Sequence, residues 1–286
     1  MLYSYVGRLR FTYEISMKIL KLIGSGLLAI SLMMSVSACK FTTGGGETTI
    51  LKGDLQYTEA ELKQQPFTEI DIETVADVYY TQTNGDKQEV RLDFSQMKDM
   101  KMKAEFEEKV KVVYRKGKMI IGLSGRIKGF STIKDNEHMR VYVTSPDLVK
   151  VSLEGIGSFS SDSINSDILE IDNEGVGGIS IKSLLANKVK VTNEGVGSVN
   201  LGKVKSDYLS VDLEGVGSVG IDQFKGGILD IDSEGVGKVS AHVDCQKVNA
   251  TLEGVGSIRL SGVTRELNKR KDGVGSLKIS DLKVVK

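Results

Sequence analysis

Carboxylate side chains recur at a fixed spacing in the C-terminal half of the chain, and they are the residues best placed to bind a charged ligand. Successive members follow one another with a period of about 20 residues, which lies in the range of repeat proteins. They are Glu154, Glu174, Glu194, Glu214, Glu234, Glu253 and Asp272, which we call the acidic row. At strand spacing, neighbouring like charges repel by about 1 kcal/mol per pair in water. The row therefore predicts either a stripe that binds cations or a cationic partner, or a solvated edge.

Motifs for catalysis or for metal binding are missing from the sequence. Two cysteines, Cys39 and Cys245, and two histidines, His138 and His242, are too few for a Cys/His metal cluster. The Gly-Val-Gly repeats lack the aspartate of the calcium-binding β-roll. We therefore expect no catalytic residues, no metal and no cofactor, and predict that the protein is not an enzyme. The alternative is a polysaccharide-degrading enzyme, which would need a local charged cluster that breaks the repeat.

Each acidic residue opens the same motif, as in Glu214-Gly215-Val216-Gly217-Ser218. Apolar residues alternate with polar ones before it, at Leu209 and Val211, and after it, at Val219 and Ile221. Alternation with a period of two indicates half-buried strands, and the fixed return of the motif indicates a solenoid. The glycines predict a bend, and we expect the valine between them to join the core. The predicted fold is an all-β parallel β-helix whose coils each contain about 20 residues.

The N-terminus has the features of a lipoprotein signal peptide. Residues 1–38 predict an over-extended start, with Met17 as initiator, followed by a basic and then an apolar stretch. Small residues precede Cys39, which resembles a bacterial lipobox and implies lipidation of that cysteine; the alternatives are a short membrane anchor or an ordinary signal. Residues 39–65 then form the lipid anchor and a Gly-rich tether.

Residues 66–147 predict an irregular strand-rich N-terminal part or cap. The stretch from Glu69 to Tyr80 aligns with a regular repeat, with Glu73 on Glu174, but it lacks the two glycines. The strands that follow in the sequence form either further irregular coils or a capping sheet, which the sequence leaves open. An end of the solenoid needs such a cover because it exposes unpaired backbone.

The regular repeats occupy residues 148–286 and end in an atypical unit. Lys269 and Lys271 stand where earlier repeats have core residues, as expected of a terminal coil. Cys245 falls near the turn of its coil, where we expect a small buried side chain.

The chain resembles the head GIN domain family of auto-transporter adhesins from Bacteroides-like Gram-negative bacteria. The resemblance covers roughly Phe67 to Lys278 and is carried by the lipoprotein start, the strand-rich segment and residues 145–158, which run Ser-Pro-Asp-Leu-Val-Lys-Val-Ser-Leu-Glu-Gly-Ile-Gly-Ser. It implies a right-handed parallel β-helix in the cell envelope. It supplies no catalytic residues.

The amino-acid composition argues against some classes of binding partner. The 38 basic and 38 acidic residues cancel, which argues against nucleic acid, and the absence of Trp argues against aromatic sugar platforms. We expect a non-catalytic cell-envelope lipoprotein, an adhesin or binding module with a glycan or protein ligand. Lipid would hold it at the outer membrane, facing either the periplasm or the cell surface.

Overall fold

The structure, a computed structural model, describes residues 63–127 and 137–285. These residues form one α-helix and a 15-stranded sheet. The predicted signal peptide, Cys39 and nearly all of the tether lie outside them. The elements in chain order are β1 (Glu69–Ile72), β2 (Val75–Gln82), β3 (Glu89–Asp93), α3 (Met100–Lys109), β4 (Val110–Arg115), β5 (Lys118–Leu123), β6 (Met139–Ser145), β7 (Lys150–Leu153), β8 (Ile156–Ser161), β9 (Ile164–Asn173), β10 (Val176–Asn193), β11 (Val196–Leu213), β12 (Val216–Ser233), β13 (Val236–Leu252), β14 (Val255–Lys271) and β15 (Val274–Val284).

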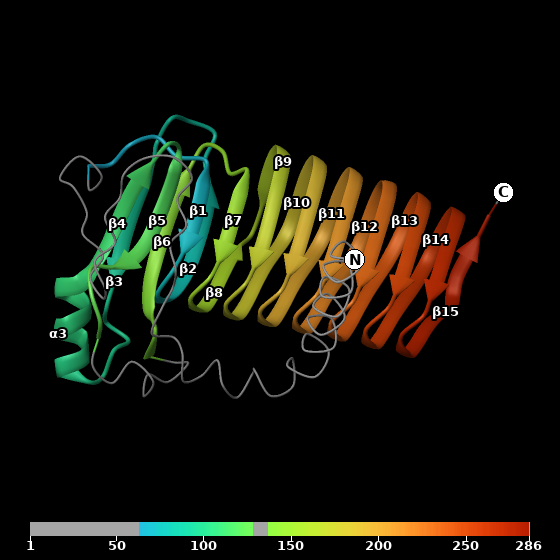
Figure 1. The fold of residues 1–286 in the computed structure, drawn as a ribbon. Helices are drawn as coiled ribbons and strands as arrows, with labels where there is room; N and C mark the ends of the chain where they lie inside the picture. The colour runs from blue at the N-terminus through green and yellow to red at the C-terminus, as the bar shows by residue number, and fades with distance from the viewer. Residues whose placement is uncertain (1–62, 128–136, 286) are drawn as a thin grey trace, which may run out of the picture. The chain divides into compact units, whose positions relative to one another are not determined.

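The regular repeats stack as parallel coils, as Figure 1 shows from β9 to β15. Residues one period apart are direct neighbours, for example Ile179 beside Val199 and Val189 beside Leu209. Each of β10 to β14 is 17 or 18 residues long and continues through the bends of its coil. The predicted solenoid is therefore confirmed, and its polar turns are bends within continuous strands.

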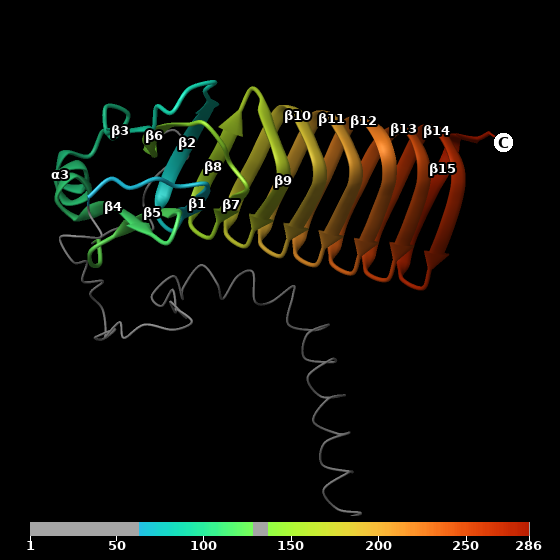
Figure 2. The same cartoon turned by 90° about the horizontal axis from the view of Figure 1, so that it is seen from above.

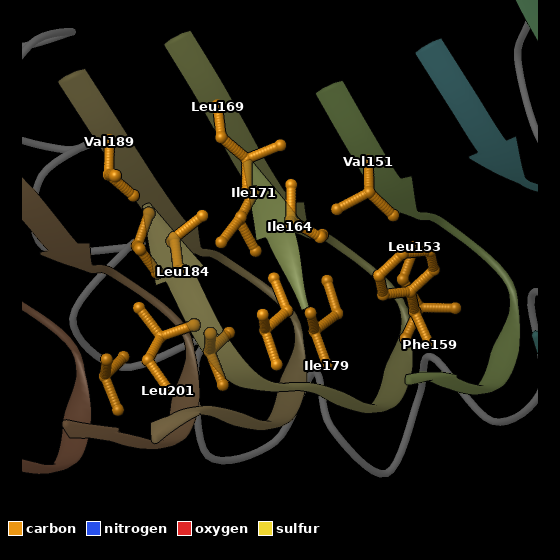
Figure 3. Close-up of a cluster of buried hydrophobic side chains, with 14 of the residues drawn as sticks. Val151, Leu153, Phe159, Ile164, Leu169, Ile171, Ile179, Leu184, Val189 and Leu201 are labelled. Atoms are coloured by element: carbon orange, nitrogen blue, oxygen red, sulfur yellow. The ribbon is translucent and has the colours of Figure 1, made fainter. Parts of the chain in front are cut away.

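The core is the interior of the coils, and it contains the two alternating apolar runs (Figure 3). Leu169, Ile171 and Ile179 are completely buried, and Leu201 is 1% exposed. Each side chain packs on its counterpart in the next coil because the strands are parallel and in register. Burial of one such apolar side chain contributes about 1.5–3 kcal/mol, so stacking is the main source of stability of the repeats.

The valine of each Gly-Val-Gly motif faces outward, so the prediction that it joins the core is wrong. Val176, Val236 and Val274 are 36%, 40% and 72% exposed. The reason is that the two-residue alternation continues through the corner, which turns the glycines toward the neighbouring coil and the valine away. A Cβ atom on Gly177, whose φ is +141°, would lie 1.8 Å from the Gly157 carbonyl oxygen. The motifs still stack side by side, with Val176 paired with Val196.

The N-terminal coil does not lie at the end of the solenoid. Strand β1 pairs in parallel with β7 on one side and with β5 on the other, and β2 likewise lies between β8 and β6. The coil formed by β1 and β2 is thus inserted between two coils that follow it in the sequence. Figure 2 shows this part of the solenoid from above.

Antiparallel strands and the helix form the cap of this end, on the side away from β15 (Figures 1 and 2). Strand β3 pairs with β6 and β4 pairs with β5, both antiparallel. Asp99 caps helix α3 by accepting hydrogen bonds from the backbone N–H groups of Lys101 and Met102, and Phe106 is buried. Residues 66–147 therefore contain both of the predicted alternatives, an irregular coil and a capping sheet.

The last coils carry the predicted signs of a terminus. Lys269 and Lys271 pair with the buried Ala250 and Leu252 of the preceding coil but are themselves exposed. Cys245 is 7% exposed, which confirms the predicted buried thiol.

Candidate functional site

The acidic row is assembled by the stacking of the coils at the glycine corner. All seven of its side chains are exposed. The backbone fixes each position: the N–H groups of Glu174 and Gly175 both donate to the Leu153 carbonyl oxygen, at 2.9 and 2.7 Å, and the same pattern recurs in later coils. A second row runs beside it, two positions further along each coil. We call it the valine row: Val176, Val196, Val216, Val236, Val255 and Val274.

Basic side chains neutralise the acidic row at its C-terminal end but not in its middle. Arg270 bridges Glu253 and Asp272, with 2.7 Å between its Nη1 and the Asp272 Oδ2. Glu194 and Glu214, at the centre of the row, form no ion pair with any residue that the structure describes. The centre therefore presents carboxylates without a direct ion pair to solvent, and Lys190 offsets part of their charge.

The environment of Glu194, at the centre of the row, disfavours its negative charge. Partial burial raises the pKa of Glu194 above its ordinary value, and the neighbouring Glu214 and Glu174 raise it further. Burial also raises the pKa of Asp212, and the neighbouring carboxylates Asp232 and Glu214 add to this effect. A bound cation or a basic partner would relieve this repulsion.

A local carboxylate cluster lies where the inserted coil meets the acidic row. One carboxylate oxygen from each of Asp71, Glu73 and Glu154 lies within 4.8 Å of the other two. Asp71 is 4% exposed, and its Oδ2 lies 2.8 Å from Lys118 Nζ. Burial raises the pKa of Glu73 to about 8, with additional repulsion from Glu154 and Asp71. Burial raises the pKa of Glu154 as well.

The sequence reasoning missed this cluster. It expected the carboxylates to recur identically in every coil, whereas this corner is set apart by its buried aspartate. The distance in sequence from Glu73 to Glu154 is close to four periods and suggested intervening coils, but the pairing of Ile72 with Leu153 makes the two glutamates neighbours. The available signal was the alignment of Glu73 with the members of the acidic row.

A shallow groove of about 500 Å³ crosses the bends of five coils, from β10 to β14. Charged side chains of both signs line it, namely Lys205, Lys225, Arg265, Asp207 and Asp244. Cys245 lies in its wall, where burial raises the pKa of the thiol. The Cys245 Sγ donates to the Lys247 carbonyl oxygen at 3.5 Å, as the Ser206 hydroxyl does to the Tyr208 carbonyl oxygen at 2.8 Å. This thiol therefore acts as a structural bend residue.

The two histidines lie apart and have structural partners. His138 Nδ1 lies 3.3 Å from Asp77 Oδ1, which also accepts a hydrogen bond from the Ser158 hydroxyl. His242 Nδ1 lies 3.0 Å from the Ser261 hydroxyl. Neither histidine belongs to the carboxylate cluster.

The predicted lipidation site, Cys39, lies outside the described residues. Over the part of the chain that is described, no helix has the length and apolar character needed to span a bilayer.

Comparisons with known proteins agree with this architecture. A putative adhesin from Bacteroides fragilis is 25% identical, with a TM-score of 0.63 over 75% of this chain and 92% of its own. A putative adhesin from Parabacteroides distasonis is 15% identical (TM-score 0.48; 79% and 95% covered), and a putative lipid binding protein from the same species is 16% identical (0.47; 76% and 94%). Among curated proteins, none matches. The family described as "Putative auto-transporter adhesin, head GIN domain" matches residues 66–242 and 208–286, and the chain belongs to it.

Proposed function

We propose that the protein is a non-catalytic cell-envelope lipoprotein, an adhesin that binds its partner through the acidic row and the valine row. One observation carries the proposal: successive coils present the same exposed carboxylate and, beside it, the same outward-facing valine in register; Val196 and Val216 are half-buried and the other valines of the row are exposed. A single coil offers one weak contact, whereas stacked coils offer many at strand spacing, and linked contacts multiply affinity. Membership in an adhesin family supports the same conclusion.

The chemistry of the two rows defines the partner. Exposed carboxylates attract positive charge, and the valines beside them add apolar contact area. The complementary ligand is a basic protein surface or a glycan that carries amino groups. Binding of this kind weakens as salt is added, because exposed charges are screened over about 8–10 Å near physiological ionic strength.

Binding is tested with a row variant and a matched control. The row variant carries Glu174→Gln, Glu194→Gln and Glu214→Gln, and the control carries Asp207→Asn, Asp222→Asn and Asp244→Asn, which remove the same charge from exposed positions at the bends. Purified proteins are screened on arrays of glycans and basic proteins. We expect the row variant alone to lose retention. Equal retention by both variants, or equal loss, would reject the acidic row as the binding surface.

The lipid anchor is tested separately. Cells fed a labelled fatty acid should label the wild-type protein and not the Cys39→Ser variant, and the variant should leave the membrane fraction. Protease treatment of intact cells then shows on which side of the outer membrane the protein lies, because an adhesin on the cell surface must be cleaved by protease added outside. Labelling of the Cys39→Ser variant would reject lipidation at this residue.

A second candidate function, polysaccharide cleavage, has the cluster of Asp71, Glu73 and Glu154 in its favour, because these carboxylates distinguish one coil from the rest. Glycoside hydrolysis uses a pair of carboxyl groups, one of them with a raised pKa. The glycan screen therefore includes product detection. Retention without turnover supports the adhesin, and turnover that disappears in Glu73→Gln supports the enzyme.

A further inference from the structure

We propose that Asp71, Glu73 and Glu154 form a binding site for one divalent oxygen-seeking cation of the calcium class, at the junction of the inserted coil with the acidic row. The three residues come from two neighbouring coils, since Asp71 and Glu73 lie in and just after β1 and Glu154 follows β7. A cation here would therefore join the irregular part of the solenoid to the regular part. The site shares Glu154 with the acidic row, but it needs no protein or glycan ligand.

The geometry suits a single ion. Two oxygens that bind the same Ca²⁺ at about 2.3–2.6 Å are at most about 5 Å apart. One oxygen from each of the three carboxylates meets this limit, because all three lie within 4.8 Å of one another. Glu73 is half-buried and Glu154 is exposed, so water can reach the remaining coordination positions. Carboxylate oxygens select Ca²⁺, Mg²⁺ or Mn²⁺ over metals that prefer nitrogen or sulfur.

A second observation independently indicates a missing ligand. Asp71 is 4% exposed, and its Oδ1 is buried with no hydrogen-bond partner, although its Oδ2 is bound by Lys118. A buried carboxylate oxygen without a partner is costly, and such atoms in native proteins are normally satisfied by a donor, a water or an ion.

The next coil shows what is specific about this corner. The position that pairs with Asp71 in β7 is Ser152, which is 3% exposed. In the coil after that, the position that pairs with Ser152 is Asp172, which is half-buried and whose Oδ2 lies 2.6 Å from Lys150 Nζ. The combination of a deeply buried aspartate and two adjoining glutamates thus occurs at this corner and not at the next.

The test is titration of the purified, chelator-treated protein with Ca²⁺ by isothermal calorimetry, with Mg²⁺ as a comparison. We expect about one Ca²⁺ per chain with a Kd at or below about 1 mM, the range of extracellular calcium modules, and a higher Tm with Ca²⁺ than with chelator. Glu154→Gln and Glu73→Gln should each weaken binding at least tenfold. Absence of saturable binding by the wild type would overturn the proposal.

Glu214→Gln is the matched control, because it removes an exposed carboxylate from the same row without touching the cluster. It should change the Kd less than twofold. An equal loss in this variant would show that the row as a whole attracts the ion, and would overturn the site. Circular dichroism checks folding; Glu154 is exposed, so this variant decides the question even if Glu73→Gln fails to fold. Calcium binding does not depend on a protein or glycan partner, so either proposal can fail without the other.

Discussion

Ile72 of β1 pairs in parallel with Leu153 of β7, although the two residues lie about four repeat periods apart in the sequence. On its other side Ile72 pairs with Ile121 of β5. Both edges of the earliest described strand are therefore covered by strands made later in the chain. An N-terminal coil is thus an interior coil of the solenoid, and the capping strands lie beyond it.

This insertion predicts the pattern of hydrogen exchange. A peptide that covers β1 and β2 should exchange as slowly as one from β11, because both are hydrogen-bonded on two sides, whereas β15 should exchange first. Strand β15 is the terminal strand of its sheet, and Val274 within it is 72% exposed. Amide exchange follows local opening, which is easiest where few apolar contacts exist. Mass spectrometry of peptides measures this; rapid exchange of 69–82 together with 274–284 would contradict the interior position.

The second glycine of a corner should be intolerant of any side chain. Gly177→Ala should lower the free energy of unfolding by about 2 kcal/mol or more, because φ at this residue is +141° and the new Cβ would lie 1.8 Å from the Gly157 carbonyl oxygen. Backbone strain of this type alone costs of order 1–3 kcal/mol. Urea unfolding monitored by circular dichroism gives the difference.

The adjacent glycine supplies the control for that experiment. A Cβ on Gly178 would meet its nearest atom, the Ser198 carbonyl oxygen, at 3.2 Å, and the neighbouring coils have Ser158 and Ser198 at this position. We expect Gly178→Ser to lie within about 0.5 kcal/mol of the wild type, as is usual for surface substitutions. If the two variants were equally stable, close coil contact would not explain the motif.

The period and the alternation were sufficient to predict the solenoid, because each residue's environment repeats along the chain. They were not sufficient to predict which residues of the Gly-Val-Gly corner face the interior. There the inward positions belong to Gly175 and Gly177, and the only apolar side chain, Val176, faces outward. Hydrophobicity alone suggested the opposite, although continuing the inward and outward alternation through the motif leads to the observed arrangement.

The inserted coil could not be predicted for a different reason. A regular period implies that each coil stacks directly on the coil that precedes it in the sequence. The interval from Glu73 to Glu154 fits four coils stacked in this way. The chain instead places β5 and β6 outside β1 and β2 and then returns to β7. The partners of Asp71 are consequently set by contacts distant in sequence, which neither composition nor spacing reveals, and the carboxylate cluster was missed with them.

Two buried asparagines in neighbouring coils are hydrogen-bonded to each other, and we expect that leucine can replace both without loss of stability. Asn173 and Asn193 are completely buried, and Asn173 Nδ2 donates to Asn193 Oδ1 at 3.0 Å. Leu153 and Leu213 occupy the same position in the flanking coils, so leucine fits this row. The double variant Asn173→Leu/Asn193→Leu should be at least as stable as the wild type, since replacing both partners of a buried hydrogen bond is near neutral or stabilising.

A single substitution tests whether the hydrogen bond between the two asparagines couples their contributions to stability. Asn193→Leu leaves the Asn173 amide without its partner in the core, which costs about 1–3 kcal/mol. It should therefore be less stable than the double variant by at least about 1 kcal/mol. Chemical unfolding of the four proteins of this cycle gives the coupling, and additive effects would show that the two asparagines act independently.

Glu73 should make the folded protein less stable as the pH rises. Its pKa is raised from 4.5 to about 8, so between these values the folded chain holds a proton that the unfolded chain has released. Stability is greatest below pH 4.5 as far as this group is concerned, and it falls by up to about 1.4 kcal/mol per pH unit until about pH 8.

Glu73→Gln cannot lose a proton, so its advantage over the wild type should be absent at low pH and should grow toward pH 8. Urea unfolding at several pH values, with chelator present to remove cations, measures the difference. A difference between Glu73→Gln and the wild type that stays flat over these pH values would mean that the Glu73 carboxyl titrates in the folded chain as it does in the unfolded chain.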